Sequence, residues 1–318
     1  MYNRVASNVR KSWILIVGFT LFVVLIGLVF GYVTNSGFWG VAIAAIVAIA
    51  MTWGSYFSSD KVALSMSHAR PAEEKDYQQL HNIVEALSLA AGIPKPKVYI
   101  VDDPAPNAFA TGRNPEHAAI AVTTGLLEKM DRDELEGVLA HELSHVKNRD
   151  TLVMTLAVTL VGVIVLLADF LLRALWWGGF GGDSREGNNP LGAIFAVLGI
   201  VLLFIAPVIA QVLQFAISRQ REFLADVDGV FLTRYPDGLI HALQKLDDDP
   251  TVVRTASRAT AHLWIESPIA RQANGKASKQ GAWLNRLFDT HPPLQDRIRA
   301  LEEAEAGGKL PEDATARA

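Results

Sequence analysis

The chain has 318 residues, half of them apolar, and a net charge of −4 at pH 7. A charge this close to neutral gives no reason to expect nucleic acid as a partner. The sequence contains no cysteine, which excludes disulfides, a thiol nucleophile and cysteine-ligated zinc. Any metal must therefore be held by histidine and carboxylate side chains.

Two uncharged apolar segments lie near the N-terminus, at residues 13–32 and 38–57. Each contains 20 residues, which matches the ~20 needed to cross ~30 Å of hydrocarbon. A cleaved signal peptide is the alternative for the first segment, but the apolar run is too long and lacks a small-residue cleavage site. We therefore predict that residues 1–57 form a membrane hairpin of two transmembrane helices.

A second pair of apolar segments follows at residues 152–177 and 191–215. The first of them contains Asp169 and Arg173, which lie four positions apart and could pair inside a helix. Two buried helices of a soluble core, or a re-entrant hairpin, are the alternatives. We predict a second membrane hairpin over residues 152–215, which gives up to four transmembrane helices.

Lysine and arginine residues set the orientation of these segments. The link at residues 33–37 has no charge, and the link at 178–190 contains Arg185 as its single basic residue. The other ends of the segments are basic, with Arg4, Arg10, Lys11, Lys61, Lys147, Arg149, Arg219 and Arg221. By the positive-inside rule, both termini and both polar regions face the cytoplasm. The prediction is a multi-pass protein of the plasma (inner) membrane, with the lipid bilayer as a partner.

The first polar region, residues 58–151, begins with a predicted helix. Pro71 suits the first helical turn, and Glu73 beside it favours the positive end of the helix dipole. Gly92 is predicted to end this helix. Short β-type stretches separated by turn residues follow at 97–101, 107–110 and 118–123.

A further helix, capped by Asp131 or Asp133, is predicted to run on into the third apolar segment. The second polar region, residues 216–303, is predicted to be helical to about Leu246. Residues 304–318 have the composition of a disordered tail. The fold class is therefore α+β and predominantly helical, and the two polar regions on one side of the membrane can build one site together.

The strongest functional signal is the sequence His-Glu-Leu-Ser-His at residues 141–145. On a helix, His141 and His145 lie about 40° apart on one face, so both imidazoles can converge on one metal ion. Catalytic zinc takes three protein ligands and a water, and Glu142 is placed to act as general base on that water. An ordinary helix with exposed His and Glu is the alternative, but such a pattern rarely arises by chance.

No histidine follows His145 in residues 146–151, so a third ligand must come from elsewhere. Glu222 and Asp226 are again four positions apart on one predicted helical face. Glu222 can ligate the zinc, and Asp226 can accept the Nδ1 proton of a ligand histidine and so fix its tautomer. The alternative is a solvated charged face at a membrane boundary.

These motifs resemble those of HtpX-type membrane zinc metalloproteases, and the resemblance extends over most of residues 70–300. It implies a gluzincin-type, zincin-like core shared with CAAX prenyl proteases, and a cytoplasmic site. It also implies a stress-response role in the quality control of membrane proteins. It implies His141, His145 and Glu222 as ligands of one zinc ion per chain. It implies Glu142 as the base. The resemblance rests on the motifs at residues 92–96, 107–112, 140–145, 222–226 and 290–293.

A weaker site is the stretch Asn107, Ala108, Phe109 and Ala110, which we predict to bind substrate. Zinc proteases bind a peptide as an added strand on a sheet edge, and Asn107 could hydrogen-bond the backbone of that peptide. The alternative is a turn asparagine that follows two prolines.

His291 and Arg297 form the second weaker site. Similar proteases carry a His and an Arg at this spacing near the metal, where either could stabilise an oxyanion or hold Asp226. A helix capped by Thr290, with Pro292 at its start, accounts for the same segment.

The predicted function is endopeptidase hydrolysis of polypeptides, with misfolded membrane proteins as the expected substrates. The alternative is a catalytically silent membrane scaffold that keeps zinc for structure, but a structural site has no use for Glu142. A transporter or channel is a third possibility, although the apolar segments hold a single ionic pair and too few polar residues for a pathway. The sequence gives no expectation for the oligomeric state.

Overall fold

The computed structural model describes residues 2–33, 37–156, 219–254, 263–266 and 292–307. By its internal contacts the chain divides into two units. The first, here called the polar unit, combines Met1–Arg10, Ser59–Thr155 and Gln214–Ala318. The second, the apolar unit, combines Lys11–Ser58 and Leu156–Leu213. The start of the chain, predicted as part of the first membrane hairpin, thus groups with the polar unit.

Two long helices contain the predicted N-terminal spans. Among the described residues, the segment Val5–Leu25 is the one stretch of helix long and apolar enough to cross a membrane by length and composition. The second predicted hairpin lies outside the described residues apart from its first few positions, and it stays a prediction. The two helices are α1 (Tyr2–Val33) and α2 (Gly37–Met66).

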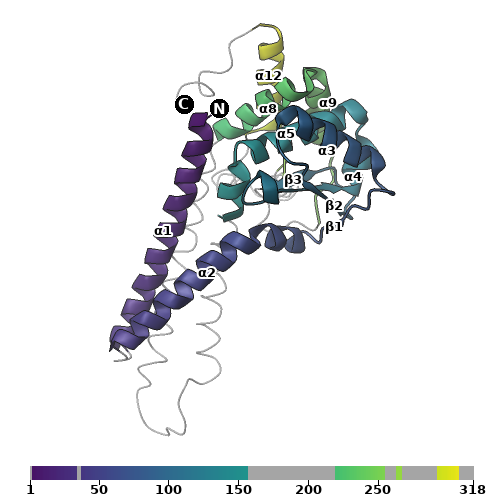
Figure 1. Ribbon diagram of the computed structural model, residues 1–318. Helices are drawn as coiled ribbons and strands as arrows, with labels where there is room; N and C mark the ends of the chain where they lie inside the picture. The colour runs from purple at the N-terminus through teal and green to yellow at the C-terminus, as the bar shows by residue number, and fades with distance from the viewer. Residues whose placement is uncertain (1, 34–36, 157–218, 255–262, 267–291, 308–318) are drawn as a thin grey trace, which may run out of the picture. The chain divides into compact units, whose positions relative to one another are not determined.

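A four-stranded sheet in the order β1-β2-β4-β3 lies in the polar unit (Figure 1). Its strands are β1 (Arg70–Pro71), β2 (Lys97–Val101), β3 (Ala108–Thr111) and β4 (Ala119–Thr123). Strands β2 and β4 are parallel, and the outer strands run antiparallel to their neighbours. The three predicted β-type stretches correspond to β2, β3 and β4 to within one residue at either end. All five residues of β4 are buried, as expected for a central strand covered on both faces.

Helices cover this sheet and pack on one another. They are α3 (Gln78–Ala91), the 3₁₀ helix η1 (Pro115–His117), α4 (Thr124–Lys129), α5 (Arg132–Lys147), α8 (Arg219–Thr233), α9 (Pro236–Asp248) and α12 (Leu294–Glu305). Helix α5 contacts β3, α3, α8 and α9, while α12 contacts α8 and α9 (Figure 1). The predominantly helical fold with a small sheet is as predicted. Its core is built from fully buried apolar side chains such as Ile100, Ile120, Leu139, Leu143 and Leu243.

Helix α3 begins later than the sequence predicted. Pro71 pairs with Tyr99 in the edge strand β1 instead of opening a helix, and an edge strand tolerates proline because no ladder bond is lost there. The residues that follow form a turn, in which the Tyr77 N–H donates to the Glu73 carbonyl. The predicted end is confirmed, since Gly92 has φ 69°, the left-handed conformation that ends helices.

Helix α5, which carries the two histidines, starts at a capping box. The Asp131 carboxylate accepts from the Glu134 N–H, and the Glu134 carboxylate accepts from the Asp131 N–H. The predicted continuation into the third apolar segment is wrong. The helix ends at Lys147 and is capped by Asn148, Arg149 has φ 58°, and a separate helical stretch begins at Asp150. A left-handed residue interrupts the hydrogen-bond ladder that a continuous helix requires.

The part of the second polar region predicted to be helical, to about Leu246, is helical where the structure describes it, and it is divided into α8 and α9. Helix α8 ends at Thr233, Arg234 has φ 55°, and Pro236 occupies the first turn of α9. The left-handed Arg234 interrupts the hydrogen-bond ladder of α8, and Pro236 suits the first turn of a new helix, so two helices form.

Helix α12 begins at Leu294, after Pro293, which is later than the alternative with Thr290 as the cap would place it. A residue that precedes proline avoids the helical conformation, which keeps Pro292 out of the helix. Thr290 lies outside the described residues. The helix continues to Glu305, so the first residues of the tail predicted at 304–318 are helical.

Two glycines let helices approach α5 closely. A Cβ on Gly229 of α8 would lie 3.0 Å from the backbone nitrogen of His141, and one on Gly137 of α5 would lie 2.7 Å from the nitrogen of Leu239 in α9. Interiors packed this densely leave no room for a larger residue. Gly229 lies seven positions after Glu222, on the same face of α8, so this close contact also brings Glu222 up to α5.

Candidate metal centre

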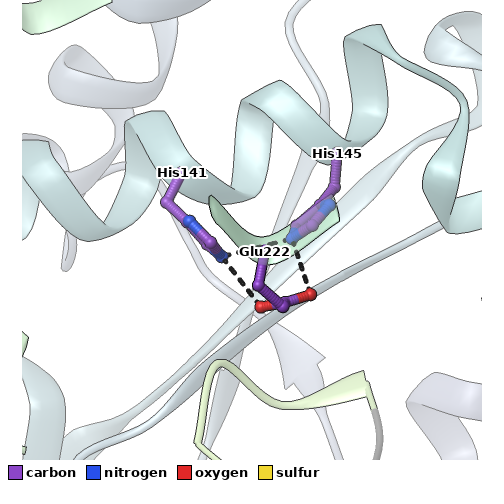
Figure 2. Close-up of side chains that lie close together, drawn as sticks. All are labelled: His141, His145 and Glu222. Atoms are coloured by element: carbon purple, nitrogen blue, oxygen red, sulfur yellow. Dashed lines mark hydrogen bonds and ion pairs between the residues drawn. The ribbon is translucent and has the colours of Figure 1, made fainter. Parts of the chain in front are cut away.

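His141 and His145 project from one face of α5 towards Glu222 of α8 (Figure 2). Their two Nε2 atoms lie 3.2 Å apart. The Glu222 carboxylate is 3.7 Å from Nε2 of His141 and 3.6 Å from Nε2 of His145. The three side chains are buried, and all their candidate ligand atoms lie within 4.8 Å of one another. The helical spacing therefore places the two histidines side by side, and the packing of α8 on α5 adds a third candidate ligand.

The separations fit a four-coordinate zinc ion. Bonds of about 2.0–2.1 Å at tetrahedral angles place neighbouring ligand atoms about 3.4 Å apart. The three separations here are 3.2, 3.6 and 3.7 Å. Two imidazoles and a carboxylate are also a donor set that catalytic zinc sites use, with a fourth position left for water or substrate.

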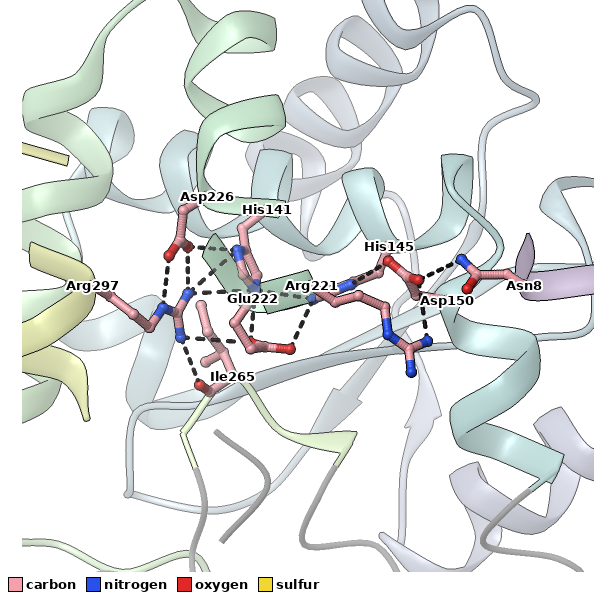
Figure 3. Close-up of polar contacts among 9 residues, drawn as sticks. All are labelled: Asn8, His141, His145, Asp150, Arg221, Glu222, Asp226, Ile265 and Arg297. Carbon is pink, nitrogen blue, oxygen red and sulfur yellow. Dashed lines mark hydrogen bonds and ion pairs between the residues drawn. The ribbon is translucent and has the colours of Figure 1, made fainter. Parts of the chain in front are cut away.

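Asp226 and Arg297 contact His141 through its other ring nitrogen (Figure 3). Nδ1 of His141 lies 2.8 Å from Asp226, so this carboxylate can accept its proton and leave Nε2 for a metal. Arg297, which is fully buried, donates to both oxygens of Asp226 at 2.8 and 2.5 Å. It also donates to the Ile265 carbonyl at 3.1 Å. His291, the predicted companion of Arg297, lies outside the described residues.

A second carboxylate, which was not predicted from the sequence, contacts the other histidine. Oδ2 of Asp150 lies 3.2 Å from Nδ1 of His145, which parallels the contact between Asp226 and His141. The other oxygen of Asp150 accepts from Asn8 at 2.6 Å (Figure 3). The five-residue spacing from His145 to Asp150 is not a helical neighbour spacing, so the pattern carried no signal. The contact exists because α5 ends between the two residues.

Buried charges surround the three candidate ligands. Four of the described carboxylates face two guanidinium groups there, which leaves an excess of two negative charges (four minus two). Unpaired buried charge is costly, so a divalent cation or bound protons would be needed to balance it. The four carboxylates belong to Glu142, Asp150, Glu222 and Asp226, and the two guanidinium groups belong to Arg221 and Arg297.

Two groups at this centre have raised pKa values. Burial and the nearby Arg297 lower the pKa of His141, but two neighbouring carboxylates raise it by more, to about 9. Burial raises the pKa of Glu142. Both groups therefore tend to hold a proton where a metal would otherwise supply positive charge. The donor set and the charge together fit a divalent metal ion.

A short segment, residues 263–266, pairs with the outer edge of β3. The Ile265 N–H donates to the Ala108 carbonyl at 2.9 Å. Trp264 and Phe109 form an antiparallel bridge, and their rings pack edge to face with centroids 4.7 Å apart. Trp264 is fully buried. The predicted substrate-binding edge is thus occupied by the chain's own residues 263–266.

Asn107, at the start of this edge, binds a peptide backbone. Its side-chain NH₂ group donates to the Glu266 backbone carbonyl at 2.9 Å, and its side-chain oxygen accepts from the Glu266 N–H at 3.3 Å. The same oxygen accepts from the Ala108 N–H at 3.0 Å, a local contact of the kind expected for a turn asparagine. Asn107 thus hydrogen-bonds the backbone of residues 263–266, and its role towards a substrate stays a prediction.

The sequence matches the model of Peptidase family M48 over residues 74–305, which include both histidines, Glu222, Asp226 and Arg297. The chain belongs to peptidase family M48. This M48 protein is accordingly a metallopeptidase, an enzyme that hydrolyses peptide bonds. The family implies a metal, and the His-His-Glu group described above could hold it.

Curated relatives of this M48 peptidase carry the name "Protease HtpX homolog". The relative from Caldanaerobacter subterraneus is 45% identical over 302 residues, which cover 95% of this chain and 97% of that one. The relative from Streptococcus gordonii is 42% identical over 305 residues, which cover 95% and 99%. A crystal structure of S. mikatae Ste24p aligns with 17% identity and a TM-score of 0.48, over 95% of this chain and 67% of that chain. The predicted HtpX-type relationship is confirmed by the curated relatives.

Proposed function

We propose that this M48 peptidase is a zinc-dependent endopeptidase with one zinc ion held by His141, His145 and Glu222. The observation that carries the proposal is their arrangement, with three candidate ligand atoms within 4.8 Å at tetrahedral-like separations. The excess of buried negative charge around them supports a divalent ion. Zinc is proposed because nitrogen and oxygen donors in a four-coordinate geometry suit it.

A bound zinc ion would polarise the scissile carbonyl and lower the pKa of an attacking water. Glu142 would take a proton from that water and deliver it to the leaving amine. Asp226 would fix the tautomer of His141 through Nδ1, and Arg297 would hold Asp226 in place. His291 stays a predicted support for the transition state or for the structure around it.

We also propose that an extended substrate binds along β3 at Asn107, Ala108, Phe109 and Ala110. The bonds of Asn107 and Ala108 to the backbone of residues 263–266 support this, because they are the bonds that an added peptide strand would make. A peptide must then displace residues 263–266. The burial of the site supports this displacement, because His141 and Glu142 are at most 2% exposed and no peptide can reach them in this conformation.

Membrane anchoring is the third part of the proposal. The apolar segment Val5–Leu25 and exposed apolar side chains on α1 and α2, among them Trp13, Leu21 and Trp53, support an anchor in the plasma membrane. The proposed layout has membrane hairpins at 1–57 and 152–215, cytoplasmic catalytic regions at 58–151 and 216–303, and a disordered tail at 304–318. Reporter fusions after Phe57 and Gln220 should read cytoplasmic, and one at Ser36 should read external. Membrane proteins in quality control are the proposed substrates.

The decisive experiment combines metal analysis with casein cleavage by the full chain purified in detergent. Wild type should carry about one zinc ion per chain and cleave casein. Glu142→Gln should keep the zinc and lose cleavage, because the side chain is not a ligand, whereas Glu222→Ala should lose both. Glu136→Gln is the matched control, the same change at a half-buried residue of the same helix, and it should keep both zinc and cleavage.

Two results would contradict the proposal. A purified wild type that binds no zinc when it is offered would remove the ion. Cleavage by Glu142→Gln within about tenfold of wild type would remove Glu142 as the base, since general base catalysis contributes at least ~100-fold.

A further inference from the structure

We propose that Asn8, at the start of the first apolar helix, is a positioning residue of the metal centre. It acts on His145 through Asp150. The inference rests on the zinc site proposed above, and it adds the N-terminal helix to the groups that determine how tightly that site holds its ion. It arises from the contacts at the end of α5, where the segments that carry Asn8, Asp150 and Arg221 meet (Figure 3).

Asn8 is buried, with 5% of its surface exposed, and both hydrogens of its side-chain amide are used at the end of α5. One is donated to Oδ1 of Asp150 at 2.6 Å, and the other to the backbone carbonyl of Asn148 at 2.8 Å. The second bond satisfies one of the carbonyls that a helix leaves unpaired at its C-terminus. Asn8 thus holds both the end of the histidine helix and the carboxylate that follows it.

The two oxygens of Asp150 have different roles. Oδ2 faces Nδ1 of His145 at 3.2 Å, while Oδ1 receives Asn8 at 2.6 Å and Arg221 at 3.3 Å. A carboxylate on the second nitrogen of a ligand histidine fixes its tautomer and ring orientation and makes it a better metal ligand. Asp150 can do this only in the rotamer that its Oδ1 donors select, and the shorter of those bonds comes from Asn8.

Among the described residues, loss of the Asn8 amide would leave Oδ1 of Asp150 with its hydrogen bond from Arg221. A guanidinium prefers to bind both oxygens of a carboxylate. Without the second donor, Asp150 can therefore turn towards Arg221 and release His145. Helix α1, which carries Asn8 in its first turns, is in this way coupled to one proposed zinc ligand.

The test measures zinc affinity of the full chain in detergent by competition with a chelator, with no reference to cleavage. Asp150→Asn should weaken zinc by roughly 10–100-fold, the range for losses of carboxylates that support ligand histidines. Asn8→Ala should weaken it by roughly 3–10-fold, because Arg221 still contacts Asp150. Asn8→Asp, which keeps the shape but places a second carboxylate against Asp150, should be worse than Asn8→Ala. Ser7→Ala, the neighbouring half-buried polar residue, should leave affinity unchanged.

A second readout separates positioning from simple loss of structure. Zinc raises the melting temperature more the more tightly it binds, because the stabilisation grows with the logarithm of the ratio of free zinc to Kd. Asn8→Ala should therefore shrink the gap between the melting temperatures of zinc-loaded and metal-free protein, whereas a purely structural role would lower both and keep the gap.

An unchanged gap together with zinc affinity within twofold of wild type would overturn the role of Asn8. Unchanged affinity in Asp150→Asn would overturn the role of Asp150 as well. Neither result bears on the proposed function, which fails only if wild type itself binds no zinc or if Glu142→Gln still cleaves.

Discussion

Replacing Arg297 by leucine removes a fully buried cation that bonds both oxygens of Asp226. The Asp226 carboxylate is itself 1% exposed, so the variant leaves it charged and buried without its two hydrogen bonds from Arg297. Burial would raise the pKa of Asp226, and it is Arg297, with help from His141, that holds this pKa below the usual range. Breaking a buried ion pair by removing one partner costs about 3–5 kcal/mol.

This loss should be visible as a lower melting temperature. For a folded unit of about 200 residues, each kcal/mol corresponds to about 2–4 °C, so Arg297→Leu should lower the melting temperature by roughly 6–20 °C. The measurement is thermal unfolding of the metal-free full chain in detergent, followed by tryptophan fluorescence. Metal-free protein is used so that altered zinc binding does not enter the comparison.

Arg299→Leu is the matched control, because it makes the same change two positions later on α12. Arg299 pairs with Asp296 at the surface, and its side chain is 65% exposed. Exposed pairs contribute at most about 1 kcal/mol, which limits the expected shift to about 4 °C. If Arg297→Leu lowered the melting temperature by no more than about 4 °C, the reasoning that a buried ion pair holds Asp226 would be refuted.

Three further outcomes are expected. Gly229→Ala should lower zinc affinity several-fold, because its new Cβ would lie 3.0 Å from the His141 backbone, whereas Gly54→Ala, with open space around it, should leave zinc affinity unchanged. Equal zinc affinities for the two variants would show that α8 can shift freely. Zinc affinity of wild type should rise by up to about tenfold per pH unit from pH 7 to about 9 and then level off, since His141 with a pKa of about 9 must lose its proton to bind zinc. Isothermal titration calorimetry in buffers of different ionisation enthalpy would show the released proton, and no proton release at pH 7 would contradict this pKa. Trp264→Ala should loosen residues 263–266 from β3 and raise kcat/KM for a peptide at constant zinc content; a fall in kcat/KM would instead make this segment part of the substrate site.

Much of the site could be predicted because its residues obey helical periodicity. His141 and His145 on one helix, and Glu222 and Asp226 on another, each lie at i and i+4, and this spacing survives whatever the tertiary structure does. The packing of α5 against α8 then brings the two pairs together. Arg297 was expected either at an oxyanion or on Asp226, and the structure places it against Asp226.

The remaining contacts depend on breaks in regular structure, and no periodic pattern encodes those. Asp150 reaches His145 because Arg149 takes a left-handed conformation, and a lone arginine in a basic flank gives no hint of it. Residues 263–266 reach β3 across a separation of more than 150 positions, which leaves no local signal. Pro71 was placed in a helix because its neighbours suit a helix start, but pairing with β2 outweighed that local preference.

The polar contacts of the centre also determine when, during translation, the enzyme can first act. Asn8 bonds a residue 142 positions later, and Arg297 contacts His141 across 156 positions. Chains grow from the N-terminus at about 5–20 residues per second, so roughly 8–30 s separate the synthesis of His141 from that of Arg297. A nascent chain carrying the H-E-x-x-H helix has neither its third candidate ligand nor the arginine that holds Asp226. The proposed site therefore cannot be complete in a growing chain until Arg297 has been made.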